Sequence, residues 1–295
     1  MSRSTPNTAA DLASQAASFL DRAEAVLDRL EAMLPAARPA EPDWNTAHAF
    51  RWRHDNRHGW LEPIHRPQQV DVDVLRGVET QRAAIERNTA RFVSGHPANN
   101  VLLTGARGTG KSSLIKAMLT RYASAGLRMI EVDKQNLVDL PDITELIASR
   151  PERFIVFCDD LGFDANDSGY MALKTALDGS LAAPPDNLLI YATSNRRHLI
   201  PENQRDNLPD QPADLHPGET VDEKISLSDR FGLWLSFYAF DQDTYLACVD
   251  TWLRQAGLPD TSDLLVRREA LLWALARGNR SGRSARQFAQ DFGSR

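Results

Sequence analysis

One stretch of the sequence combines glycines, a lysine and a serine at a spacing that suits phosphate binding. It runs Gly105-Ala106-Arg107-Gly108-Thr109-Gly110-Lys111-Ser112 and fits the pattern G-x-x-x-x-G-K-[ST]. Glycines let the backbone curl so that several N–H groups point at one phosphate chain. In such a loop we expect Lys111 to contact the β- and γ-phosphates and the Ser112 hydroxyl to complete the coordination shell of Mg²⁺.

The residues on both sides of this loop fit a strand that enters it and a helix that leaves it. Residues 100–104 form a short apolar run, and residues 113–122 carry apolar side chains at helical spacing. The amino end of a helix adds a partial positive charge, so we count Ser113 with the expected phosphate-binding residues. A chance glycine-rich turn is the alternative, and this context disfavours it. The sequence therefore predicts a nucleotide site.

Polar side chains follow two further apolar runs. Asp159 and Asp160 end the run 154–160, and a carboxylate there, beside the phosphate loop, can hold Mg²⁺ directly or through water. A second carboxylate can polarise a water for attack on the γ-phosphate. We assign the metal role to Asp159 and the water-activating role to Asp160. Asn195 follows the run 188–193 and can hydrogen-bond the water and the γ-phosphate, although ordinary turn chemistry is the alternative.

Two arginines outside these motifs are candidates for contact with the phosphates. Arg230, in Leu227-Ser-Asp-Arg-Phe-Gly-Leu233, would reach the γ-phosphate of a neighbouring subunit if it lies near a seam between subunits. A local pair with Asp229 is the alternative. Arg283 falls in the first turn of a predicted late helix, from which it could touch the phosphates, and Arg280 and Arg286 are rival candidates. Arginines on a solvated helix face are the alternative.

The elements that position these residues indicate an α/β protein. Apolar runs at 127–133, 154–160 and 188–193 alternate with helical patterns at 79–93, 143–149 and 169–181. This alternation predicts a doubly wound parallel sheet over residues 71–240, while residues 241–295 are purely helical and predict a small α-domain. Residues 203–223 are rich in Pro, Asp, Asn and Gly and predict a long loop.

The first 70 residues allow more than one interpretation. Residues 8–34 predict one amphipathic helix, and the prolines that follow predict a linker, so residues 1–43 form one unit. This helix would pack on the main body or pair with a partner. Residues 44–70 interleave tryptophan with arginine and histidine. They fit a basic, aromatic surface for a partner such as nucleic acid, or an arm that its tryptophans pin to the body. We favour the pinned arm, and expect no zinc at its histidines.

Composition narrows the class of protein. The 295 residues carry a formal net charge of −6, which argues against non-specific coating of nucleic acid. The two cysteines, Cys158 and Cys248, lie in apolar surroundings and predict buried free thiols in a reducing cytoplasm. We expect neither a membrane span nor an export signal.

The order of these motifs resembles that of the AAA+ ATPases. Residues 97–105, 108–113, 157–161 and 192–198 look more specifically like a bacterial group of predicted AAA+ ATPases, the domain-of-unknown-function 815 family, over about residues 60–292. The resemblance makes Gly105–Ser112 the Walker A motif and Asp159–Asp160 the Walker B motif. It makes Asn195 sensor 1, Arg230 the arginine finger and Arg283 sensor 2, and it places Val74–Val78 near the adenine. Asp160 departs from the glutamate of many members.

The resemblance implies an ATPase that binds Mg·ATP at the interface of a homo-oligomer and remodels or switches an unknown protein partner. The alternative is a nucleic-acid-associated factor of the helicase-loader or initiator type, which Arg196 and Arg197 favour and the net charge does not indicate. A small-molecule kinase ranks last, because such enzymes more usually carry an arginine-bearing lid and a shaped acceptor pocket.

Overall fold

The structure is a computed structural model that describes residues 17–20, 22–27, 29, 42–55, 58–163, 168–178, 185–196 and 230–294. The predicted loop at 203–223 and most of the predicted linker lie outside these residues, as do residues 8–16 and 30–34 of the predicted first helix. The strands are β1 (Ala49–His54), β2 (Gly59–Pro63), β3 (Val101–Gly105), β4 (Leu127–Glu131), β5 (Arg153–Cys158), β6 (Leu188–Ser194) and β7 (Leu233–Phe237). The α-helices are α2 (Glu79–Val93), α3 (Lys111–Tyr122), α4 (Leu140–Ile147), α5 (Ser168–Asp178), α7 (Gln242–Gln255), α8 (Leu264–Ala276) and α9 (Gly282–Phe292).

The strands form one seven-stranded sheet in the order β2-β1-β4-β5-β6-β3-β7. Every neighbouring pair is parallel except β1 and β2, which form an antiparallel hairpin. The α/β fold with a largely parallel sheet is thus confirmed, and β3 lies inside the sheet between β6 and β7. Because parallel strands share one direction, the segments that leave their carboxyl ends meet at a single edge.

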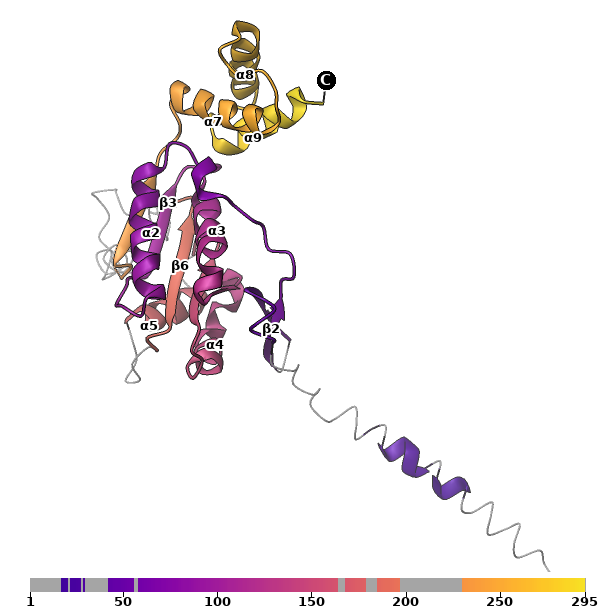
Figure 1. Ribbon diagram of the computed structural model, residues 1–295. Helices are drawn as coiled ribbons and strands as arrows, with labels where there is room; N and C mark the ends of the chain where they lie inside the picture. The colour runs from indigo at the N-terminus through magenta and orange to yellow at the C-terminus, as the bar shows by residue number, and fades with distance from the viewer. Residues whose placement is uncertain are drawn as a thin grey trace, which may run out of the picture.

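The side chains of the central strands alternate between two hydrophobic layers. In β5, Phe154 and Val156 belong to a cluster with α4 and α5, whereas Ile155 and Phe157 belong to a cluster with α2 and α3. The sheet is therefore buried on both faces, as continuous apolar strands require. Figure 1 shows α2 and α3 side by side on one face.

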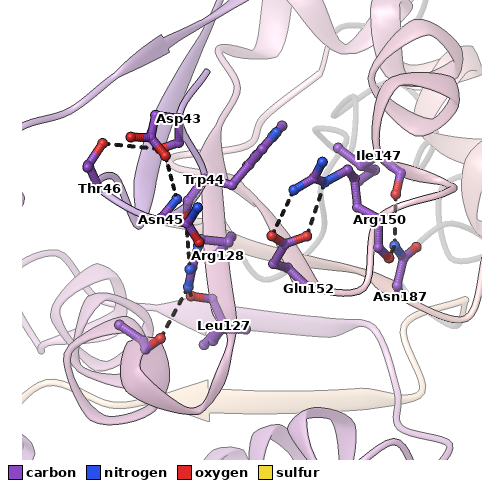
Figure 2. A network of polar contacts seen from close by, with 11 residues as sticks. Asp43, Trp44, Asn45, Thr46, Leu127, Arg128, Ile147, Arg150, Glu152 and Asn187 are labelled. Atoms are coloured by element: carbon purple, nitrogen blue, oxygen red, sulfur yellow. Dashed lines mark hydrogen bonds and ion pairs between the residues drawn. The ribbon is translucent and has the colours of Figure 1, made fainter. Parts of the chain in front are cut away.

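Residues 44–70 differ from the expected separate arm, because they carry β1 and β2 and extend the sheet past β4. Trp44 and Trp52 are buried in the core, and Trp52 Nε1 donates to Asp139 at 2.9 Å. Figure 2 shows Arg128 against the start of this segment, where its Nη2 donates to the Trp44 carbonyl at 2.8 Å. The tryptophans thus pin the segment, as expected, but two of the three are unavailable for stacking on bases.

The residues from Phe240 onward have a hydrophobic cluster of their own, built from α7, α8 and α9. We call these three helices the lid. The lid lies beyond the carboxyl ends of the strands (Figure 1). The segment before α2 joins the lid to the sheet: Gly77 packs against Thr244, and Arg76 Nε donates to the Thr251 hydroxyl at 3.2 Å. No helix among the described residues is long and apolar enough to cross a membrane.

Candidate functional site

The loop between β3 and α3 is held so that its backbone curls beneath the first turn of the helix. Gly105 has φ of 128°, and a Cβ there would lie 1.8 Å from the Phe237 carbonyl oxygen of β7. That oxygen accepts the Ala106 N–H at 3.2 Å, and the Thr109 hydroxyl donates to the Ala106 carbonyl at 2.8 Å. Gly110, with φ of 99°, precedes Lys111 as the N-cap of α3. Only a residue without a side chain fits at Gly105.

Lys111 lies at the centre of the site and is only 6% exposed. Its Nζ donates to the Gly105 and Ala106 carbonyls at 2.7 and 2.8 Å and to Asn195 Oδ1 at 3.0 Å. Burial lowers the pKa of the Lys111 ammonium most strongly, Asp159 and Asp160 oppose this shift, and nearby arginines add to it. A phosphate chain would supply the negative charge that this partly desolvated ammonium lacks.

Ser112 and Asp159 form the candidate magnesium site. The Ser112 hydroxyl donates to Asp159 Oδ1 at 2.6 Å, which brings the first turn of α3 to the end of β5. The Thr193 hydroxyl, from β6, donates to the same oxygen at 2.6 Å. A hydroxyl and a carboxylate beside a phosphate site are the hard oxygen donors that Mg²⁺ takes, so these residues fit that ion.

Asp160 and Asn195 lie at the ends of adjacent strands and contact each other. Asn195 Nδ2 donates to Asp160 Oδ1 at 2.5 Å, while its Oδ1 accepts from Lys111, so Asn195 bridges the cation and the carboxylate. Asp160 has φ of 55°, and its N–H donates to the Thr193 hydroxyl at 2.9 Å. Asp160, Asn195, Arg107 and Arg196 line an open cavity of about 470 Å³ in front of the loop.

The amino end of α9 packs directly on the phosphate loop and brings one arginine with it. The Arg283 N–H donates to the Gly108 carbonyl at 3.3 Å, and a Cβ at Gly108 would lie 2.8 Å from the Ser281 hydroxyl. The rival arginines lie elsewhere: Arg286 stands over the Trp252 ring at 5.2 Å, and Arg280 lines a separate cavity beside α8. Of the three, Arg283 is the one beside the phosphate loop.

The family model described as "Protein of unknown function (DUF815)" matches residues 45–295. The chain belongs to this family. The solved structure of the FIGL-1 AAA domain in complex with ADP superposes with a TM-score of 0.50 and 17% identity, over 77% of this chain and 74% of that chain. The Thermotoga maritima RuvB Holliday junction branch migration motor superposes with a TM-score of 0.40 and 15% identity, over 75% and 71% of the two chains. No curated protein matches.

The FIGL-1 likeness gives this family member the AAA+ type of P-loop fold. In that fold the described residues gather nearly all the predicted positions at one sheet edge: the loop 105–113, the two aspartates, Asn195 and Arg283. Arg230 does not join them. It precedes β7 at the amino ends of the strands and pairs with Asp178 at the end of α5. Its neighbour Asp229, the partner named in the alternative of a local pair, lies outside the described residues.

Two residues of the site were not singled out from the sequence. Thr193 contacts both aspartates, and Ser281 caps α9 where that helix meets Gly108. The sequence held a signal for Thr193, because a buried strand that ends Thr-Ser-Asn places polar groups beside the phosphate loop. For Ser281 the signal was only that of a helix cap.

Proposed function

We propose that this protein is an AAA+ ATPase that binds and hydrolyses Mg·ATP at an interface between subunits and uses the cycle to switch or remodel a protein partner. The observation that carries the proposal is the connected set of contacts Lys111–Asn195–Asp160 and Ser112–Asp159–Thr193 at the mouth of the loop. These contacts bring together an ammonium group for the phosphates, a carboxylate for the metal and a second carboxylate. Phosphoryl transfer to water requires these parts.

Each side chain then has a definite task. The loop N–H groups and Lys111 bind the β- and γ-phosphates. Ser112 and Asp159 would hold Mg²⁺, which would supply positive charge beside the phosphate oxygens. Asp160 accepts a proton from the attacking water, and Asn195 orients that water against the γ-phosphate. Arg283 binds the phosphates from the lid, so closure of the lid depends on the nucleotide.

The interface belongs to the proposal because Arg230 lies away from its own loop. In the parallel pairing of β3 and β7, Val101 lies opposite Leu233 and Gly105 opposite Phe237. Arg230 precedes Leu233, so at least about 13 Å of strand separates it from the level of the phosphate loop. An arginine there serves a neighbour's site, which favours a homo-oligomer. We place the protein in the cytoplasm, in keeping with its two buried free thiols.

The proposed reaction is tested by phosphate release from ATP with no added acceptor. Lys111→Ala removes the cation and is expected to abolish ATP binding and turnover together. Asp160→Asn keeps the shape of the side chain and is expected to bind ATP with near-normal affinity while turnover falls at least about 100-fold. Asp160→Asn turning over at the wild-type rate would contradict the assignment of the base. Release that requires an added acceptor would indicate a kinase instead.

A further inference from the structure

Helix α8 carries apolar side chains on two opposite faces. Val266, Ala270 and Ala274 are buried in the lid core. On the outward side, Leu264 and Leu275 are 78% and 76% exposed, and Leu272 is 52% exposed. A surface helix ordinarily presents polar residues to water. A contiguous apolar face on a small domain therefore indicates an interaction surface.

An open groove of about 380 Å³ follows this outward face. Leu264, Leu271, Leu272 and Leu275 line it, together with Gln242 and the three arginines 267, 268 and 280, and no carboxylate takes part. A fitting partner therefore combines an apolar stripe with acidic groups. A second α8 face does not fit, because two copies would bring six arginines together and like charges oppose such a contact.

The chain itself supplies a segment of the required chemistry near its start. The described residues 17–20 and 22–27 are helical and expose Phe19, Leu20, Val26 and Leu27, each more than half exposed. In the sequence, acidic residues recur at 21, 24, 28 and 31, at steps of three and four, with Arg22 and Arg29 among them. The segment thus combines exposed apolar side chains with an excess of acidic over basic residues, here called its acidic flank, and it complements the groove in both respects.

We propose that the α8 groove is the docking site for residues 17–29 of a neighbouring copy of this chain. The first segment joins the body at Trp44, which contacts Phe154 at the amino end of β5, whereas the lid lies beyond the carboxyl ends. Docking on a neighbour ties the lid of one subunit to the body of the next. The contact goes beyond the proposed ATPase reaction and does not require hydrolysis.

Cross-linking of full-chain variants that each carry one added, exposed cysteine tests the contact. Cys158 and Cys248 are buried, so a cysteine placed at an exposed leucine reacts selectively. Leu27→Cys protein is mixed with Leu272→Cys protein and treated with a short bismaleimide, and a covalent dimer of the two is expected. Met171→Cys, on α5 and 57% exposed, replaces Leu272→Cys as the matched control and is expected to give little dimer. Equal dimer yields with Leu272→Cys and Met171→Cys, or no dimer at all, would overturn the proposal. A chain that carries both Leu27→Cys and Leu272→Cys and cross-links only within itself would also overturn it.

A charge exchange tests the same contact without cross-linking. Arg268→Glu and Glu24→Arg are each expected to weaken association about fivefold, and the double variant is expected to restore it. Independent, additive losses would overturn the assignment of the acidic flank to this groove. The cross-link is also measured in the Lys111→Ala background, where we expect it to persist. The docking contact is thereby measured in a protein that does not turn over ATP, so its failure and the failure of the proposed ATPase reaction can be told apart.

Discussion

Asp160 shows how one residue's backbone conformation restricts the chemistry of the site. Its φ of 55° lies in the left-handed region, which aspartate and asparagine tolerate better than longer side chains. The N–H to Thr193 and the Asn195 contact hold the carboxylate toward the cavity in front of the loop. Many AAA+ proteins carry glutamate at this position. Here the conformation gives a physical reason for the shorter acid, since glutamate would add strain and project one carbon further.

Thr193 is a positioning residue, because its hydroxyl contacts the Asp159 carboxylate and the Asp160 backbone at once. Thr193→Val keeps the shape of this fully buried side chain and removes both contacts. We expect kcat to fall about 10- to 100-fold, since removal of a residue that orients a metal ligand typically costs this much. ATP affinity measured without Mg²⁺ should change little, because Thr193 does not contact the phosphate loop.

Thr193→Ser is the control for that experiment. It keeps the hydroxyl and is expected to recover most of the activity, whereas a purely structural role of the methyl group predicts the reverse order of the two variants. The apparent affinity for Mg²⁺, measured by titration of the metal at saturating ATP, should weaken in Thr193→Val alone. An unchanged Mg²⁺ requirement in that variant would contradict the positioning role.

Lys111 predicts a pH dependence of nucleotide binding. Burial first, and neighbouring arginines next, hold its pKa below the ordinary 10.5, and bound phosphates would raise it again. Between these two pKa values ATP binding takes up a proton, so affinity should fall as pH rises, by at most about tenfold per pH unit. Because the unfolded chain also binds that proton more tightly, the free energy of unfolding without nucleotide rises with pH over the corresponding window.

Calorimetry of ATP binding in buffers of different ionisation enthalpy measures this proton uptake. Lys111→Arg provides the control, because a guanidinium keeps its charge throughout the accessible pH range. Proton uptake at alkaline pH should therefore disappear in that variant. Equal uptake in both proteins would assign the proton to another group.

At the scale of elements, the buried central strands were predictable and the β1–β2 hairpin was not. Strands β3 to β6 are continuous apolar runs, which a parallel sheet buried on both faces demands. In β1 the apolar Phe50 and Trp52 alternate with Arg51 and Arg53. The arginines pair with Glu131 and Glu62. The alternation therefore indicates a strand with one solvent-exposed face rather than a basic surface. The Phe237 carbonyl and the Ser281 cap reach the loop only through tertiary packing, which spacing along the chain does not reveal.

Gly108 couples the phosphate loop to α9 and predicts how the two move together. A methyl group there meets Ser281 and Arg283, and φ of 76° strains any side chain. We expect Gly108→Ala to displace α9 and weaken ATP binding roughly tenfold, which corresponds to about 1.4 kcal/mol. Gly126→Ala is the matched control, because Gly126 has φ of 96° and open space around it, away from the loop.

Thermal unfolding and ATP titration of the two alanine variants separate strain from coupling. Each should lose about 1–2 kcal/mol of stability from the left-handed backbone. Only Gly108→Ala should also lose ATP affinity. Equal affinities in the two variants would show that α9 does not act on the nucleotide through this contact.

At the scale of the whole molecule, the two arginines named as phosphate contacts lie on opposite sides of the α/β body. Arg283 reaches the loop of its own chain through the lid, whereas Arg230 stands at the amino ends of the strands beside Asp178. One subunit therefore presents a nearly complete site at one edge and a separate arginine at the other. In the proposed homo-oligomer, a closed ring or a filament would unite these two edges, since head-to-tail contacts repeat the same pairing.

Complementation tests this arrangement most directly. Arg230→Ala should bind ATP normally and lose about 10³-fold in kcat, the lower range for an arginine finger. Lys111→Ala should be inactive because it does not bind ATP. Mixed assemblies of the two contain sites in which an intact loop meets an intact Arg230, so the mixture should regain a fraction of wild-type turnover that rises with protein concentration. Asp178→Asn, which removes the described ion-pair partner of Arg230, should keep its turnover. A mixture as inactive as its components would contradict action of Arg230 on a neighbour.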